Sequence, residues 1–153
     1  MGARRAFEPG SPDFRERVRE SFGRQRVMGL FGARILRIEP GRVDLLLPFR
    51  EDLTQQHGFL HAGVTAAVVD SACGYAALTL MPADAAVLSI EYKVNMLAPG
   101  KGDALEARAH VVRAGRNVTV CTGEGWMRDG RSRKQVACMT ATLMTIRGRG
   151  IEG

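Results

Sequence analysis

Apolar and polar residues alternate between residues 104 and 113, which is the pattern of a half-buried β-strand. The apolar positions Leu105, Ala107, Ala109 and Val111 alternate there with Glu106, Arg108 and His110. Because successive side chains of a strand point to opposite faces, we expect one face of this strand to pack on a core and the other to face water.

Five other segments have a strand-like composition, namely residues 34–38, 42–49, 86–97, 117–128 and 133–146. Turn-forming residues separate two pairs of these predicted strands, at Glu39-Pro40-Gly41 and at Ala114-Gly115-Arg116. Short connections of this kind join antiparallel neighbours, so we expect a sheet built mainly of antiparallel hairpins.

The N-terminal part has the spacing of a helix. Phe14, Val18 and Phe22 lie four residues apart, and Ser11-Pro12-Asp13 before them has the composition of a helix start, with a capping serine and a proline at the first helical position. We expect a helix over residues 12–22 and a second helical turn or two over residues 24–30. Together they form an N-terminal helical extension over residues 11–30.

The segment 61–80 is rich in small and apolar residues, and Asp70 is its only charged residue. This composition predicts a buried helix, which Pro82 ends. Burying a carboxylate costs several kcal/mol unless it is paired, hydrogen-bonded or protonated, so Asp70 is the first candidate for chemistry. A structural carboxylate is the alternative. Gly74 on the same helix is expected to serve close packing.

The predicted elements follow the order helix, two strands, long helix, four strands, with a polar loop over residues 51–60. This order favours an α+β fold rather than a doubly wound one. A chain of 153 residues suits one domain, residues 1–153, and the Gly/Arg-rich end at residues 148–153 is expected to be flexible.

Composition narrows the class of protein. No apolar run reaches the roughly 20 residues of a membrane span, and the N-terminus has no apolar signal region, so we expect a cytoplasmic protein without membrane contact. The net charge of +6 favours an anionic partner. The arginines are scattered and aromatic residues make up only 6%, so a phosphate-bearing small molecule fits better than nucleic acid.

The cysteines and histidines give no metal or disulfide signature. Cys73, Cys121 and Cys138 are odd in number, widely spaced and in apolar surroundings, which suits buried side chains in a reducing compartment. His57 and His61 lack a third ligand, so we expect them to shape their loop rather than bind a metal.

Three features together resemble a known family. They are the segment Gln55-Gln56-His57-Gly58-Phe59-Leu60-His61-Ala62-Gly63-Val64, the aspartate on the long helix, and the strand over residues 87–100. The chain resembles the hotdog-fold acyl-CoA thioesterases of the PaaI-like and 4-hydroxybenzoyl-CoA thioesterase groups. The resemblance implies a long central helix wrapped by an antiparallel sheet, and hydrolysis of acyl-CoA to a free acid and CoA without a cofactor or metal. Ala62 departs from the family, which has glycine there.

The resemblance also implies roles for individual residues. Asp70 would be the nucleophile or general base, and the N–H of Ala62, with that of Gly63, would polarise the thioester carbonyl. Gln55 would touch the carbonyl or the water, and Ser89 would hold the attacking water.

Substrate binding would involve the loop and two turn residues. His57, Gly58 and His61 would shape the loop around the substrate. Arg113 and Arg116 lie at a predicted turn and would contact the phosphates of CoA.

Helix geometry predicts a shared site. Eight residues at about 1.5 Å each separate Ala62 from Asp70 by roughly 12 Å, so one carbonyl cannot touch both groups of the same helix. The groups must meet from antiparallel helices of two subunits, which predicts a homodimer at least. We expect a homotetramer built as a dimer of dimers.

Two other functions remain open from the sequence. A hotdog enoyl-CoA hydratase or dehydratase would recruit His57 or His61 beside a carboxylate. A non-catalytic acyl-CoA-binding protein would keep the fold alone, and Ala62 leaves this possibility open.

Overall fold

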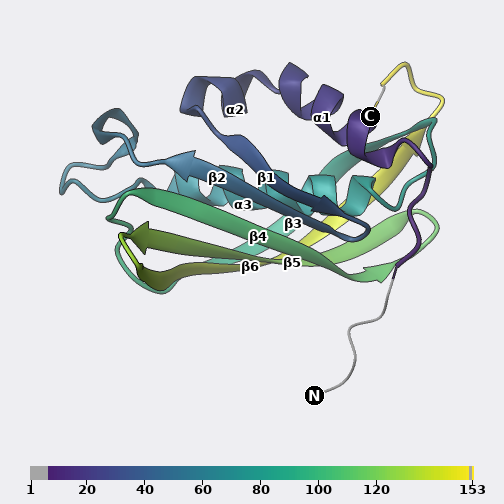
Figure 1. Ribbon diagram of the computed structural model, residues 1–153. Coiled ribbons are helices and arrows are strands. Elements are labelled where there is room, and N and C mark those ends of the chain that lie inside the picture. Colours follow the sequence, from purple (N-terminus) through teal and green to yellow (C-terminus); the bar gives the residue numbers. More distant parts are fainter. Residues whose placement is uncertain (1–6, 152) are drawn as a thin grey trace.

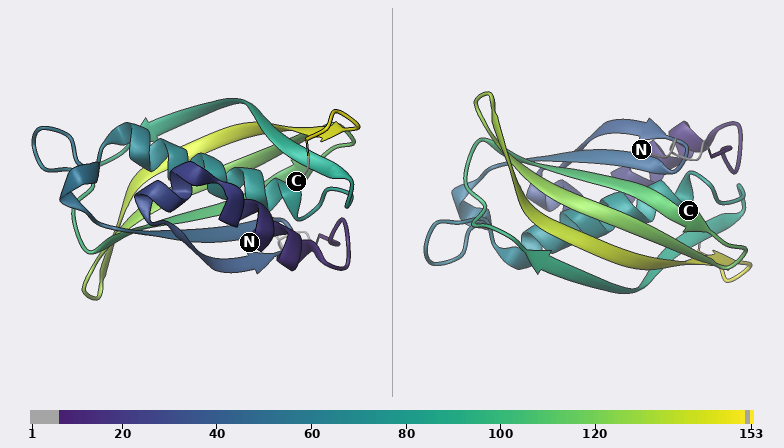
Figure 2. Two further views of the ribbon diagram at one scale, coloured as in Figure 1. Left: turned by 90° about the horizontal axis from the view of Figure 1, so that it is seen from above. Right: turned by 90° about the horizontal axis from the view of Figure 1, so that it is seen from below.

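The computed structural model describes residues 7–151 and 153. A six-stranded antiparallel sheet wraps around the long helix α3 (Ala62–Leu78), while α1 (Phe14–Arg24) and α2 (Arg26–Phe31) lie on the same side of the sheet as α3 (Figure 1, Figure 2). The strands are β1 (Arg34–Glu39), β2 (Arg42–Pro48), β3 (Ala85–Met96), β4 (Ala104–Ala114), β5 (Val118–Asp129) and β6 (Ser132–Arg147). This arrangement confirms the predicted α+β hotdog architecture.

The sheet order β1-β2-β4-β5-β6-β3 leaves β1 and β3 at the two edges. Every neighbouring pair is antiparallel. The β1–β2 and β4–β5 pairs are the hairpins that the turn residues predict, and β5–β6 is a further hairpin. The short 3₁₀ helix η1 (Glu51–Leu53) and the loop after it lead the chain from β2 to the start of α3. Each strand boundary agrees with its prediction to within one residue.

Helix α3 forms the centre of the core because it has almost no polar face. Eleven of its 17 residues are buried, among them Val68, Val69 and Cys73. It ends at Leu78, before Pro82, and the Thr79 hydroxyl donates to the carbonyl of Ala76 at 2.6 Å. A helix so apolar on all sides is stable only when other elements cover it.

The N-terminal helix begins later than predicted. The N-cap residue is Asp13 and the first helical residue is Phe14, so Ser11 and Pro12 form a turn before the helix. The predicted cap at Ser11 is therefore wrong. The apolar spacing correctly predicts the inner face of this helix, since Phe14 and Val18 are buried there.

The outer face of the sheet is more covered than the alternation in β4 predicts. Glu106 is only 7% exposed, because Arg108 at 2.8 Å and Arg133 at 4.0 Å pair with its carboxylate. Asp44 on β2 is 4% exposed and pairs with Arg42 at 2.9 Å. The prediction that this face is exposed to water was wrong for Glu106, since long arginine side chains cover neighbouring carboxylates.

Close contact between sheet and helix depends on Gly123 of β5. A Cβ atom added there would lie 2.6 Å from Val69 Cγ1 and 2.9 Å from Cys73 Sγ. We expect Gly123→Ala to lower the free energy of unfolding by about 1–3 kcal/mol through overpacking, measured by urea denaturation. Gly23→Ala on α1 is the matched control, because its Cβ would meet no atom within 4 Å. Equal stability of both variants would contradict the close packing.

None of the helices in the described part of the chain is long and apolar enough to cross a membrane. The C-terminal tail lies near α1, and the carbonyl of Gly153 accepts a hydrogen bond from Arg24 at 3.1 Å.

Candidate active site

Asp70 and Ser89 come together from two elements. Asp70 lies in the middle of α3 and is half-buried, while Ser89 lies on the edge strand β3. The Ser89 hydroxyl donates a hydrogen bond to Asp70 Oδ1 at 2.8 Å. The two residues are 19 positions apart in sequence, and in the described part of the chain no other two candidate catalytic residues share a side-chain hydrogen bond.

A β-bulge directs Ser89 toward the helix. Ser89 pairs with the buried Leu143, but Glu91 pairs with Thr142, so Ile90 is an extra residue in β3. Without the bulge, Ser89 and Glu91 would point to the same face, because they are two residues apart. Glu91 instead accepts a hydrogen bond from the Thr142 hydroxyl at 2.6 Å on the outer face.

The environment of Asp70 favours its neutral form. Burial raises the pKa of Asp70 above its usual value, and the hydrogen bond from Ser89 opposes part of this effect. The carboxylate lines a cavity of about 150 Å³ between α3, β3 and the C-terminal end of α1. A half-buried carboxylate with a raised pKa beside a cavity is a common property of catalytic acids and bases.

The start of α3 supplies a backbone donor. His61 is the N-cap residue, and its Nδ1 accepts a hydrogen bond from the N–H of Gly63 at 2.9 Å. The Gly63 N–H is therefore occupied in this structure, and its contact with a thioester carbonyl stays a prediction. The N–H of Ala62 has no acceptor within the helix, because it belongs to the first turn.

Gln55 lies beside Ala62 in a second cavity of about 430 Å³. Residues 55–58 form a tight turn in which the Gly58 N–H donates to the Gln55 carbonyl at 2.9 Å. Gly58 has a φ of +78°, a conformation that favours glycine. The Gln55 side-chain oxygen accepts a hydrogen bond from the backbone N–H of His57, which closes the turn further. The contact of His57, Gly58 and His61 with a substrate stays a prediction.

The structure thus brings the candidate residues together as two separate groups. Asp70 and Ser89 line the smaller cavity, Gln55 and Ala62 line the larger one, and the two cavities share no lining residue among those described. This separation agrees with the distance along α3 that predicts a shared site.

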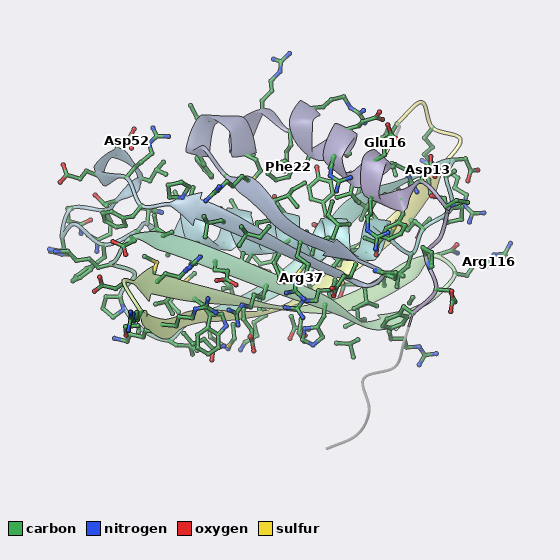
Figure 3. All side chains as sticks on the ribbon, in the orientation of Figure 1. Asp13, Glu16, Phe22, Arg37, Asp52 and Arg116 are labelled. Atoms are coloured by element: carbon green, nitrogen blue, oxygen red, sulfur yellow. The ribbon has the colours of Figure 1, made fainter. Side chains whose placement is uncertain are left out.

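Arg113 and Arg116 lie away from the loop before α3. Arg113 is exposed near the end of β4, and Arg116 lies in the turn that follows. Figure 3 shows Arg116 at the opposite end of the molecule from Asp52, which belongs to η1. Their contact with CoA phosphates stays a prediction.

Cys73 lies one turn from Asp70 but is poorly suited to attack a substrate. It is completely buried, and burial raises the pKa of its thiol well above the usual value. Burial likewise raises the pKa of Cys121 to about 12. Both side chains fill the core, as predicted, whereas Cys138 is half-buried.

Sequence reasoning missed part of the cavity wall. Ser21, Gln25 and Tyr75 line the cavity beside Asp70. Figure 3 shows Phe22 on α1, and its ring packs edge-on against Tyr75 with 5.7 Å between centroids. No local signal marks Ser21 or Gln25, because the packing of α1 on α3 brings them there. Gly74 also lines the cavity, and an added Cβ would meet no described atom within 4 Å. The expectation that Gly74 serves close packing is therefore wrong within the described part of this chain.

Comparisons with known proteins identify the family of this chain. The family model of the thioesterase superfamily matches residues 57–134. A crystal structure of a thioesterase family protein from Silicibacter pomeroyi is 50% identical, covers 88% of this chain and 99% of its own, and has a TM-score of 0.87. The 1,4-dihydroxy-2-naphthoyl-CoA hydrolase of Listeria monocytogenes is 28% identical over 96 residues, which are 61% of this chain and 78% of that protein.

The fold is also that of the E. coli PaaI protein from the phenylacetic acid degradation operon. That structure is 21% identical, covers 91% of this chain and 97% of its own, and has a TM-score of 0.81. These similarities confirm the family that the motif around His61 and Asp70 indicates. Since the family model spans just over half of the chain, the protein belongs to the thioesterase superfamily and is a hotdog-fold thioester hydrolase.

Proposed function

We propose that this protein hydrolyses acyl-CoA thioesters at a site shared by two copies of the chain. Asp70 and Ser89 come from one copy, and Gln55 and the N–H of Ala62 come from the other. The observation that carries the proposal is the Asp70 carboxylate, which lines a cavity and holds a hydrogen bond from Ser89 at 2.8 Å.

The carboxylate of Asp70 has one oxygen available for chemistry. Ser89 occupies Oδ1, which leaves Oδ2 to take a proton from water or to attack the carbonyl carbon. In the first route, the water oxygen bonds to the carbonyl carbon, the C–S bond breaks, and the CoA sulfur leaves and takes up a proton. In the second route, Oδ2 bonds to the carbonyl carbon, the C–S bond breaks and CoA leaves. Water then hydrolyses the acyl-aspartyl anhydride, which releases the free acid, restores the carboxylate and supplies the proton that the CoA sulfur takes up. Both routes require the ionised carboxylate.

The start of α3 stabilises the charge that develops on the carbonyl oxygen. The first N–H groups of a helix carry partial positive charge and lack intrahelical acceptors. His61 occupies the N–H of Gly63, so the N–H of Ala62 is the donor that the substrate carbonyl would use. The Gln55 side chain lines the same cavity and would contact the carbonyl or the water.

The edge strand β3 supports the dimer. It is 12 residues long, its outer edge has no neighbouring strand in the sheet, and Leu88, Ile90 and Tyr92 are 46%, 53% and 44% exposed. A long apolar edge strand is a template for pairing with another chain. Antiparallel pairing of two β3 strands would place the two α3 helices antiparallel, as the shared site requires. A homotetramer would be two such dimers.

The proposal is tested by incubating the protein with a panel of acyl-CoAs and a thiol reagent. Release of free CoA from at least one acyl-CoA is the expected result. Hydration of an enoyl-CoA without thiol release would indicate a hydratase. Binding of acyl-CoA with neither reaction would indicate a non-catalytic acyl-CoA-binding protein.

The pH dependence of kcat/KM should report the ionisation of Asp70. Since burial raises the pKa of this group, activity should fall in mild acid, at a pH above the ordinary aspartate pKa of 3.8. Ser89→Ala removes the hydrogen bond that lowers this pKa, so the acidic limb should move to higher pH. An acidic limb unchanged in Ser89→Ala would contradict the coupling between these residues.

A further inference from the structure

The C-terminal tail (residues 148–153) turns back from the end of β6 toward α1 (Figure 1). Gly148 and Gly150 have φ values of +65° and +68°, left-handed conformations that favour glycine and that turn the chain here. The Arg24 guanidinium donates to the carbonyl of Gly153 at 3.1 Å. A Cβ atom added at Gly153 would overlap the carbonyl of the first residue of β3. The tail therefore contacts both α1 and β3.

The tail separates two cavities. The first, of about 150 Å³, is the one that Asp70 and Ser89 line. The second, of about 700 Å³, lies between α1, the turn before β3 and the tail, and its carboxylate side chains are those of Asp13, Glu16, Glu20 and Asp84. Among the described residues that line either cavity, Ile151 and Gly153 line both. Since glycine has no side chain, Ile151 supplies the side chain between the two cavities.

The position of Ile151 limits the size of the cavity beside Asp70. Ile151 is 44% exposed, so a ligand in a cavity that it lines can contact its side chain. An engineered cavity of about 150 Å³ in another protein holds one benzene molecule. A butanoyl group has fewer heavy atoms than benzene, and an octanoyl group has more. A short acyl group therefore fits beside Asp70, whereas a longer one meets the tail.

We infer that Ile151 is a specificity-determining residue, whose side chain closes the cavity beside Asp70 and limits the length of the acyl group. This inference rests on the proposed hydrolysis of acyl-CoA at Asp70. The tail lies outside residues 57–134, which the family model matches, so the limit belongs to this chain and not to the family motif.

A smaller side chain at position 151 would join the two cavities. The end of a long acyl group would then pass into the larger cavity instead of meeting the tail. Four carboxylates line that cavity and keep it hydrated, so it offers an apolar chain little to bind. We therefore expect the variant to tolerate long acyl groups, and not to prefer them.

The test compares acyl-CoAs that differ in length. A straight-chain series runs from butanoyl-CoA to decanoyl-CoA, and an aromatic pair consists of benzoyl-CoA and 4-butylbenzoyl-CoA. In the unchanged protein we expect kcat/KM to favour butanoyl-CoA over octanoyl-CoA, or benzoyl-CoA over its butyl derivative, by about tenfold or more, since each methylene that does not fit costs transition-state binding. In Ile151→Ala this preference should fall toward one.

A second variant should change the preference in the opposite direction. Gly74→Ala adds a methyl group inside the same cavity, because its Cβ would meet no described atom within 4 Å. Alanine is the residue best suited to a helix, so the fold is retained. The preference for butanoyl-CoA over hexanoyl-CoA, or for benzoyl-CoA over its butyl derivative, should rise by about tenfold.

Two controls separate the closure of the cavity from other effects. Ile151→Leu keeps the volume of the side chain and should keep the preference for short groups. Leu36→Ala on β1 shortens an apolar side chain that is 43% exposed and lines neither cavity, and it should also keep the preference.

Three results would overturn the inference. They are a preference that is unchanged in Ile151→Ala, a preference that is unchanged in Gly74→Ala, and an unchanged protein that hydrolyses the long acyl groups as well as the short ones or better. If none of the acyl-CoAs is hydrolysed, the proposed function itself fails, which is a distinguishable result.

Discussion

Asp70→Asn should lower kcat by at least about 10³, because it removes the nucleophile or base and preserves the shape of the side chain. Asparagine can still accept the hydrogen bond from Ser89 through its side-chain oxygen, so the contact between α3 and β3 is retained. The measurement is kcat on the best acyl-CoA of the panel. Hydrolysis at nearly the unchanged rate would exclude Asp70 as the catalytic group.

The same variant carries its own control for folding. A carboxylate whose pKa is raised in the folded state binds its proton more tightly there, so it destabilises the fold as pH rises from the unfolded pKa through the folded one. At neutral pH, Asp70→Asn should therefore be at least as stable as the unchanged protein. An inactive variant with equal or higher stability shows that chemistry was lost and the fold was kept.

Complementation between two inactive variants should restore activity if the site is shared. Ala62→Pro deletes the N–H at the first helical position, where proline is tolerated, and His61 already has the extended backbone that a following proline requires, with φ −60° and ψ 135°. We expect kcat to fall by roughly 10²–10³, the cost of losing one donor to the oxyanion. Asp70→Ala should be inactive because the carboxylate is missing.

Co-refolding the two variants in equal amounts should give heterodimers as about half of all dimers. In each heterodimer, one site takes Asp70 from the Ala62→Pro chain and the Ala62 N–H from the Asp70→Ala chain. That site is complete, and the other lacks both groups. Activity should therefore recover to about one quarter of the unchanged protein per subunit, if pairing is random and the sites are independent.

The control for this experiment is detection of the heterodimer by mass. Each variant refolded alone should stay inactive, since a homodimer of either contains no complete site. Heterodimers without recovered activity would show that each site is built within one chain. The separation of the two cavities would then have another cause.

The sequence by itself determined the elements and their order. Local signals are sufficient there, because the alternation in β4 and the turn at Gly115 depend on neighbouring residues. An almost wholly apolar α3 must lie inside whatever surrounds it. Asp70 was recognisable for the same reason, as a single charge in an apolar helix. The boundary at Ser11 was wrong because several residues before Phe14 can cap a helix, and only the backbone decides which one does.

Only the tertiary structure decided how the site is built. The bulge at Ile90 reverses the alternation of β3 and brings Ser89 to Asp70, and the packing of α1 on α3 brings Gln25 to the same cavity. The His61 ring takes up the N–H of Gly63. Each of these depends on contacts between residues or on one extra residue in a strand. Spacing along the chain does not encode such contacts, because they form only when distant elements pack together.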